Sequence, residues 1–225
     1  MPILILDTST ERGFVAILEG LQLLYHVQLP FGMQNAQSLL PEIHRGLAFT
    51  GFSINQMEFV GVGIGPGSYT GMRVGATVAK TLTFACGLPL VGVCSLDAFV
   101  PLQAGAYAAI IDAKVGGVYL QTGYFGQGVV TELSGPQIYS INEAAEMLLN
   151  VPVLVTPNAT QLRPKLEKEL ASSQWRWEES FPSPMDMARR ARQKIERQEF
   201  SLNGHLDLLY LRKTQAEIEK EKMRS

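Results

Sequence analysis

The sequence predicts a two-lobed α/β protein that arose by internal duplication. Residues 4–7 and 14–16 read LILD and FVA, and residues 110–112 and 118–120 read IID and VYL in the same order. The two acids that end the first runs, Asp7 and Asp112, lie 105 residues apart. A repeat of this size in 225 residues predicts two similar lobes, each with a mixed sheet flanked by helices.

The order of elements follows from continuous apolar runs of strand length and from apolar residues at helical spacing. Leu40, Ile43 and Leu47 mark a helix, whose first turns Pro41 is expected to kink or tighten. A short helix is expected to begin at an N-cap, Ser95. We expect strands at 3–6, 14–18, 21–29, 59–62, 90–93, 107–112, 118–124 and 153–155, and helices at 35–49, 70–86, 140–149, 161–170, 185–198 and 214–224. The lobes are predicted to span residues 1–103 and 104–225.

Composition excludes several classes of protein. With 46% apolar residues, 18% charged residues and a net charge of -2, the chain is neither disordered nor basic enough to bind nucleic acid unaided. The charge is uneven, because residues 1–150 carry 5 basic and 10 acidic side chains, and residues 151–225 carry 14 and 11. Cys86 and Cys94 lie in apolar sequence, as reduced thiols do in the cytosol. With neither a signal peptide nor an apolar run of 18 residues expected, a cytoplasmic location is predicted.

The glycine-rich loop from residue 63 to 71 is the most informative segment. Backbone N–H groups before a helix favour an anion site, whereas glycines alone can serve a tight strand-to-helix turn, and the local pattern leaves both readings open. No Lys follows the last glycine as in a P-loop, and Val91 stands where a dinucleotide fingerprint needs an acid. Ser68 lacks the glycine two residues earlier that a nucleophile elbow needs, because Pro66 stands there.

Catalytic residues are not expected in this chain. His26, His44 and His205 are isolated in the sequence, so no metal site is predicted. Asp7 and Asp112 could flank a cleft between the lobes, but alone they make an incomplete active site.

Small residues recur every four positions in the helix after the loop, at Gly71, Gly75 and Ala79. Glycine inside a helix costs about 1 kcal/mol relative to alanine, so close packing of this face is expected to offset the cost. The packing could be internal, against the sheet, or external, against a partner.

Several segments together resemble the bacterial TsaB family, also called YeaZ. They read ILDTS at 5–9, QSLLP at 37–41, GPGSYTGMRVG at 65–75, IDAK at 111–114 and LYLR at 209–212, and they span the chain in the family's order.

This resemblance implies two lobes of the actin/Hsp70/hexokinase-like (ASKHA) fold. It also implies a role in forming N6-threonylcarbamoyladenosine at adenosine 37 of tRNAs that read codons starting with A. In that system the related TsaD is catalytic, TsaE is an ATPase, and TsaB is a non-catalytic partner. ATP is used by the complex, and no cofactor is expected to be required by this chain. Asp7, Ser9, Gly67 and Ser68 would then be a degenerate nucleotide site.

The resemblance further implies that two helices of the first lobe form the surface that packs on TsaD or on a second copy. The residues expected there are Asn35, Leu39, Leu40, Ile43, Gly71, Met72, Gly75 and Ala79. Many relatives carry His where this chain has Asn35. Contact with tRNA is expected only through the complex, and the sequence leaves open whether Arg189, Arg190 and Arg192 touch it. The alternatives are a small ASKHA ATPase or phosphotransferase and a glycoprotease-like hydrolase.

Overall fold

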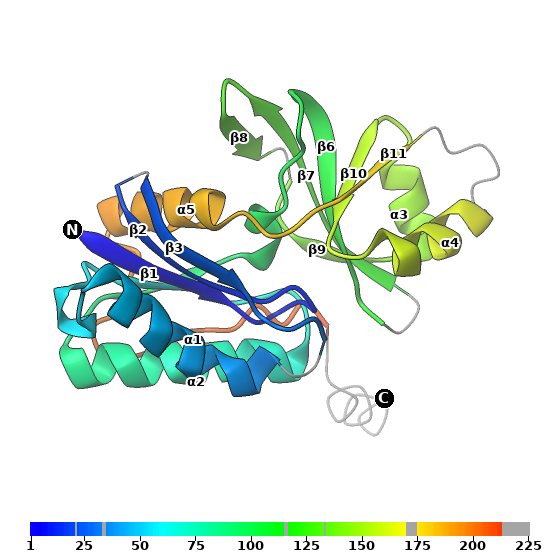
Figure 1. The fold of residues 1–225 in the computed structure, drawn as a ribbon. Helices are drawn as coiled ribbons and strands as arrows, with labels where there is room; N and C mark the ends of the chain where they lie inside the picture. The colour runs from blue at the N-terminus through cyan, green and yellow to red at the C-terminus, as the bar shows by residue number, and fades with distance from the viewer. Residues whose placement is uncertain (21, 33–34, 115–116, 133, 170–174, 213–225) are drawn as a thin grey trace, which may run out of the picture.

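The computed structural model describes residues 1–212 apart from 21, 33–34, 115–116, 133 and 170–174. Two mixed sheets form two lobes that lie side by side (Figure 1). In the first lobe the strand order is β3-β2-β1-β4-β5, with β1 antiparallel to β2 and parallel to β4. These strands are β1 (Pro2–Asp7), β2 (Phe14–Glu19), β3 (Gln22–Gln28), β4 (Val60–Gly63) and β5 (Leu90–Val93).

The second lobe repeats this arrangement. Its order is β11-β10-β6-β7-β8, with β9 also pairing with β7, and β6 is antiparallel to β7 and parallel to β10. The strands are β6 (Gly105–Asp112), β7 (Gly117–Gly126), β8 (Val129–Glu132), β9 (Gln137–Ser140), β10 (Val153–Thr156) and β11 (Arg176–Glu179). A hairpin followed by parallel strands therefore opens both lobes, which confirms the predicted duplication and the ASKHA fold class.

Helices cover the outer face of each sheet. In the first lobe, α1 (Asn35–Thr50) and α2 (Tyr69–Cys86) lie below the sheet in Figure 1, and α2 begins at the N-cap Ser68 and ends at Gly87 in the left-handed conformation. In the second lobe, α3 (Ile141–Met147) begins with a capping box between Ser140 and Glu143 and packs beside α4 (Ala159–Glu169). Two short 3-10 helices are η1 (Ile54–Gln56) and η2 (Ser95–Ala98).

The basic helix α5 (Pro184–Glu196) returns to the first lobe. It packs on β1, β2, β4 and β5 and on η2, so the first sheet is sandwiched between α1 and α2 on one face and α5 on the other (Figure 1). The predicted boundaries place this helix in the C-terminal lobe, whereas it packs on the sheet of the first lobe. The reason is that Met187, Ala188 and Ala191 are buried in the apolar cluster that joins the two sheets. The boundary at residue 103 stays a prediction.

The core explains why the first strands are apolar at every position. In β1, Ile3 and Ile5 belong to the cluster shared with α5 and the second lobe, whereas Leu4 and Leu6 belong to the cluster under α1 and α2. A strand buried on both faces has no solvent side and so shows no polar alternation.

Most predicted elements are present within a few residues of their expected ends. The sequence analysis missed β8, β9 and β11, each of four residues. Ser95 was wrongly assigned as an N-cap, because Cys94 holds that position and the Ser95 hydroxyl accepts a hydrogen bond from the Gly65 N–H at 3.1 Å. The predicted helix at 214–224 lies outside the described residues. Among the helices that are described, none is long and apolar enough to cross a membrane.

Candidate functional site

The glycine-rich loop connects β4 to α2 and packs directly on the turn between β1 and β2. The Ser68 N–H donates to the Ser9 carbonyl at 2.6 Å, and the Thr8 hydroxyl donates to the Gly71 carbonyl at 2.7 Å. The Ser68 hydroxyl in turn accepts from the Gly71 N–H at 3.2 Å, which caps α2 from within the chain. The loop and the turn are therefore joined along their backbones.

Two loop glycines are required because the backbone of the turn occupies the space of a side chain. A Cβ atom at Gly67 would lie 2.2 Å from the Ser9 carbonyl oxygen, and one at Gly71 would lie 2.0 Å from the Thr8 carbonyl oxygen. Carbonyl oxygens thus sit where an anion cradle would need open space before the helix. Of the two readings that the sequence left open, the geometry favours close packing of the chain on itself.

The four residues expected at a degenerate nucleotide site do meet here, but they form a closed cluster. Asp7 is 4% exposed, and its Oδ1 accepts from the Ser9 N–H at 2.6 Å. Burial raises the pKa of the Asp7 carboxyl, and the hydrogen bond from the Ser9 backbone N–H opposes that shift only in part. The Ser9 hydroxyl is buried without a hydrogen-bond partner. Asp7 therefore faces packed protein, whereas Gly67 and Ser68 are partly exposed, with the Ser9 carbonyl against Gly67.

The second acid of the duplication, Asp112, is held by lysines. Its Oδ2 lies 2.8 Å from Lys165 Nζ and 3.8 Å from Lys114 Nζ, and its side chain is 8% exposed. Asp112 is therefore engaged in a local ion-pair network rather than free to face Asp7. In the part of the chain that the structure describes, no group of three His, Cys, Asp or Glu residues could hold a metal ion.

Outside the loop, α1 and α2 present an exposed surface of mixed character. The exposed stripe of α2 runs at helical spacing through Tyr69, Arg73, Thr77, Thr81 and Phe84. Phe84 is 75% exposed, and α2 contains no acidic residue. We call this stripe, together with the exposed Leu40 and Phe49 of α1, the α1–α2 surface.

Comparison with known proteins identifies the family. Residues 33–216, about four fifths of the chain, match the family model described as TsaD, tRNA N6-adenosine threonylcarbamoyltransferase. Relatives of this chain bear the name tRNA threonylcarbamoyladenosine biosynthesis protein TsaB. The chain belongs to this family, within its TsaB (YeaZ) group.

The TsaB relatives match this chain over part of their length. The chain is 36% identical over 124 residues to TsaB of Haemophilus influenzae, covering 53% of this chain and 52% of that protein. It is 27% identical over 175 residues to TsaB of Bacillus subtilis, covering 76% of each. The match thus spans about half the length of the Haemophilus influenzae protein.

Solved structures show the same fold over nearly the whole chain. YeaZ from Pseudomonas aeruginosa superposes with a TM-score of 0.78 at 22% identity, covering 93% of this chain and 99% of that one. A second Pseudomonas aeruginosa structure, described as an uncharacterized protein with similarity to peptidase YEAZ, has a TM-score of 0.79 at 23% identity, covering 94% and 99%.

The residues that the TsaB resemblance placed at a partner surface lie mostly inside the lobe. Exposure is 0% at Leu39 and Ala79 and 3% at Ile43 and Met72, and Gly75 is buried. Leu39, Ile43 and Ala79 pack in the apolar cluster of the first sheet, so their side chains do not face outward, and the assignment of these two helices to an interface stays a prediction. Leu40, at 55% exposure, does face outward, Gly71 is partly exposed, and the side chain of Asn35 lies outside what the structure describes.

The small-residue face of α2 is thus internal. A Cβ at Gly75 would already lie 2.6 Å from Thr8 Oγ1 and 3.5 Å from Leu6 Cδ1, so Gly75→Leu should perturb folding rather than leave an intact monomer. The four-residue spacing predicted that one face of α2 packs closely on a neighbour, and that neighbour is the sheet of the same lobe.

Three arginines of α5 form hydrogen bonds with other segments of this TsaB-family chain. Arg192 forms two hydrogen bonds to the Glu58 carboxylate, at 3.1 and 3.2 Å. Arg189 and Arg190 donate to the carbonyls of Gly128 and Val130, which lie in the β7–β8 hairpin of the other lobe. Through these hydrogen bonds Arg189 and Arg190 link α5 to the second lobe.

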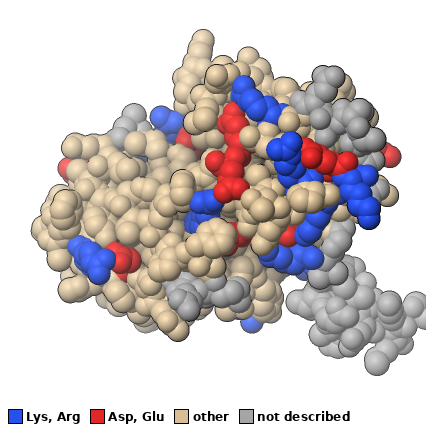
Figure 2. All heavy atoms as spheres, turned by 45° about the vertical axis from the view of Figure 1, so that its right-hand side comes forward, with Lys and Arg blue, Asp and Glu red and all other residues tan. Residues whose placement is uncertain are grey.

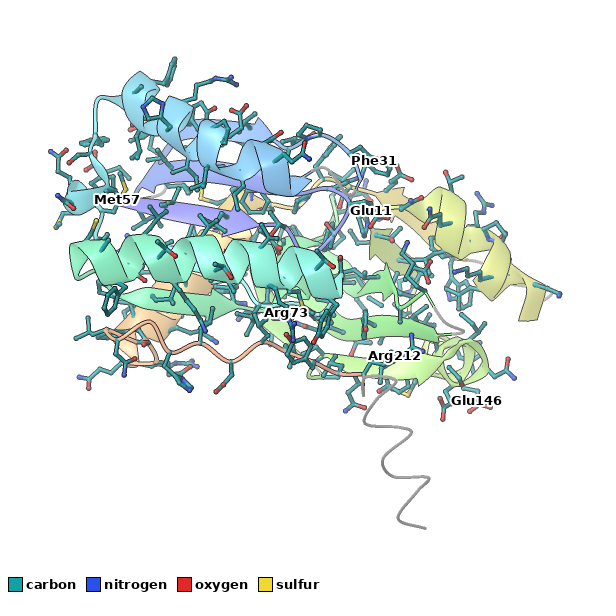
Figure 3. All side chains as sticks on the ribbon, turned by 90° about the horizontal axis from the view of Figure 1, so that it is seen from below. Glu11, Phe31, Met57, Arg73, Glu146 and Arg212 are labelled. Carbon is teal, nitrogen blue, oxygen red and sulfur yellow. The ribbon has the colours of Figure 1, made fainter. Side chains whose placement is uncertain are left out.

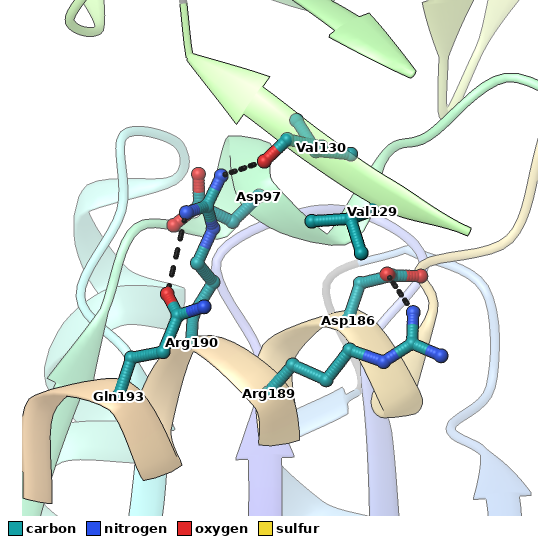
Figure 4. A pocket seen from close by; sticks show the side chains of 7 residues that line it. All are labelled: Asp97, Val129, Val130, Asp186, Arg189, Arg190 and Gln193. Carbon is teal, nitrogen blue, oxygen red and sulfur yellow. Dashed lines mark hydrogen bonds and ion pairs between the residues drawn. The ribbon is translucent and has the colours of Figure 1, made fainter. Parts of the chain in front are cut away.

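A shallow cleft lies at this junction (Figure 4). Its base holds Asp97 of η2, a residue that the sequence analysis missed and whose Oδ1 accepts from Gln121 Nε2 at 2.9 Å. Burial raises the pKa of the Asp97 carboxyl. The lining residues are Asp97, Val129, Val130, Asp186, Arg189, Arg190 and Gln193. Since Arg189 and Arg190 of α5 donate to the carbonyls of Gly128 and Val130, the cleft lies where the two lobes are joined.

Arg12 is a second residue that the sequence analysis missed. It extends from the β1–β2 turn to the second lobe, where it donates to the Pro157 carbonyl at 2.5 Å and to the Glu179 carboxylate. Its guanidinium also lies 4.3 Å from the centre of the Phe181 ring. The neighbouring Glu11 accepts from Asn158 at 3.1 Å, at the junction seen in Figure 3. No periodicity marks Arg12, because its hydrogen-bond partners in the second lobe lie 145 and 167 residues away.

Proposed function

We propose that this chain is a non-catalytic subunit in the formation of N6-threonylcarbamoyladenosine at adenosine 37 of tRNAs that read codons starting with A. It pairs with a TsaD-like catalytic chain, and a TsaE-like ATPase joins them. ATP is consumed by the complex, with no cofactor required by this chain, and tRNA is reached through the complex in the cytoplasm. The family match and the names of the TsaB relatives support the pathway.

One observation carries the non-catalytic role. The loop that would serve a nucleotide in an ASKHA enzyme is filled by the carbonyls of Thr8 and Ser9, and the acid beside it, Asp7, is buried against the chain. Substrate could reach these groups only if the loop and the turn separated, which would break the hydrogen bonds that join them.

The α1–α2 surface is our candidate for the contact with the catalytic chain. It exposes Leu40 by 55%, Phe49 by 74% and Phe84 by 75%. Large apolar side chains gathered on two neighbouring helices are a common feature of protein interfaces. A second copy of this chain could use the same surface, which would give a homodimer in the absence of the partner.

Reconstitution tests the proposal directly. Purified chain is mixed with the TsaD-type and TsaE-type proteins of the same organism, an activated threonylcarbamoyl donor, ATP and unmodified tRNA, and the modified nucleoside is quantified by mass spectrometry. We expect modification to need this chain and to be lost with Phe84→Glu. Leu149→Glu is the matched control, because Leu149 is 68% exposed on the second lobe. Full activity without this chain would refute the proposal.

Calorimetry separates this proposal from an ATPase or phosphotransferase. ATP with magnesium should give no saturable heat with the isolated chain, because the carbonyls of Ser9 and Thr8 fill the loop. Micromolar binding would favour the enzyme instead. A glycoprotease-like hydrolase is tested by incubation with glycoprotein substrates, where cleavage by the purified chain would support it.

A further inference from the structure

Arg73 lies on the exposed stripe of α2 between two tyrosines from distant parts of the chain. Its Nε donates to the Tyr210 hydroxyl at 3.0 Å, and its Nη2 donates to the Tyr69 hydroxyl. The guanidinium lies 3.9 Å from the centre of the Tyr69 ring, and the two tyrosine rings are 5.2 Å apart. Figure 3 shows Arg73 between α2 and the C-terminal segment that crosses below it. We call Tyr69, Arg73 and Tyr210 the arginine clamp.

The clamp is held in place by the chain that carries Tyr210. The Leu209 N–H donates to the Ile64 carbonyl at 2.9 Å, and Leu206 packs on the core beneath α2. Farther along, Arg212 donates to the Ala113 carbonyl of the second lobe at 3.1 Å. Tyr210 is therefore fixed on both sides, and it presents Arg73 in a defined orientation before any partner arrives.

The Arg73 guanidinium has more N–H donors than its two tyrosine partners use. A guanidinium carries five N–H groups, and the two tyrosine hydroxyls use two of them. Arg73 pairs with no carboxylate among the described residues, whereas Arg45 of α1 pairs with Glu42 and Arg163 of α4 pairs with Glu167. Tyr69 and Tyr210 are each 43% exposed, so the clamp is open to a neighbouring molecule.

We propose that the arginine clamp receives a carboxylate of the catalytic partner when that protein packs on the α1–α2 surface. The inference rests on the proposed function, and it adds which chemistry the partner must present. A planar guanidinium oriented by two hydroxyls matches a carboxylate in a two-point contact. Arginine and tyrosine are also the residues that most often dominate the binding energy of an interface.

The surroundings favour a protein carboxylate over the phosphates of a nucleic acid. Along the stripe from Arg73 the exposed residues are Thr77, Thr81 and Phe84, which are uncharged and so offer a phosphate backbone no further cation. Binding to a phosphate backbone draws on several cations together, and α2 carries only Arg73 and Lys80. In Figure 2, charged side chains crowd the right of the view, over the C-terminal lobe, and are sparse on the left, over the first lobe.

Titration calorimetry of the full chain with the TsaD-type protein of the same organism tests the inference. We expect Arg73→Gln to bind about 10 to 100 times more weakly, the range for one charged hydrogen-bonded pair, and to lose part of the salt dependence of binding. Tyr210→Phe should weaken binding less, because the cation remains but loses one orienting hydroxyl. Arg163→Gln is the control, since it removes the same charge from the second lobe and should leave the affinity unchanged.

The possible outcomes separate the inference from the proposed function. Binding by the wild type and by Arg73→Gln with equal affinity overturns the inference and leaves the proposed function standing, whereas no binding by the wild type overturns both. A loss of tRNA affinity without a loss of partner affinity would assign Arg73 to phosphate instead. If the Arg73 effect vanished in a chain that ends at Arg212, the acids of the C-terminal segment would be the ligand, and the inference would fail. Restoration of Arg73→Glu binding by a carboxylate-to-lysine change in the partner would confirm it.

Discussion

Gly71→Ala is expected to destabilise the protein although alanine favours helices. Gly71 lies in the first turn of α2, and a Cβ there would lie 2.0 Å from the Thr8 carbonyl oxygen. Real Cβ atoms essentially never approach a heavy atom within 3.0 Å, so the β1–β2 turn must move by about an ångström. That movement would disturb the hydrogen bond from the Thr8 hydroxyl to the Gly71 carbonyl.

The magnitude follows from three contributions. Helix propensity favours alanine by about 1 kcal/mol, overpacking costs about 1–3 kcal/mol, and loss of the hydrogen bond costs about 1 kcal/mol. The net expectation is a loss of about 2 kcal/mol in the free energy of unfolding, which for a chain of this length lowers Tm by about 4–8 °C.

Denaturant unfolding followed by circular dichroism measures the effect. Gly75→Ala should cost less than Gly71→Ala, because its Cβ would lie 2.6 Å from the Thr8 hydroxyl, a side-chain atom that can move. Thr77→Ala on the exposed stripe is the control and should be neutral or slightly stabilising. Unchanged stability of Gly71→Ala would refute the view that the loop is packed on the turn.

Two further predictions concern the junction of the lobes and the buried acid. Arg12→Ala should lower the free energy of unfolding by about 1.5–3 kcal/mol, because Arg12 is 15% exposed and donates to Glu179 across the lobes. Arg163→Ala is the control in urea unfolding, since the exposed ion pair of Arg163 is worth about 0.3–0.5 kcal/mol. Equal effects of the two substitutions would argue against such a junction. The raised pKa of the Asp7 carboxyl means that its charged form opposes folding at neutral pH, and that this cost disappears as pH falls through the folded pKa toward 3.8. Asp7→Asn should therefore stabilise the protein more at pH 7.5 than near pH 3.8 in the same assay, and a gain independent of pH would contradict the assigned cause.

Local patterns were enough to predict most elements because the responsible forces act over a few residues. The apolar spacing of Leu40, Ile43 and Leu47 predicted α1, although it did not show that Leu40 faces outward while Ile43 is buried. The four-residue strands β8 and β11 carry too little periodic signal, since their pairing with β7 and β10 is what stabilises them.

At the candidate site, the sequence predicted which residues lie close together but not how they pack. Asp7, Ser9, Gly67 and Ser68 were expected together, and the structure places them together. Whether the glycines leave room for an anion or for backbone depends on atoms of another segment, here the carbonyl of Thr8 and that of Ser9. The contact between Arg73 and Tyr210 was not predicted, because the two residues lie 137 positions apart in the sequence.

The sequence by itself determined the duplication, the class of the fold and the need for small residues along one face of α2. These properties follow from hydrophobic periodicity and from steric limits that each segment carries alone. Only the tertiary structure decided that this face packs on β1, that α5 returns to the first lobe and that Arg73 remains exposed without an acid among the described residues. The physical reason is that an apolar or small-residue face limits what kind of surface can pack on it. Which segment of the chain supplies that surface depends on how the whole chain packs.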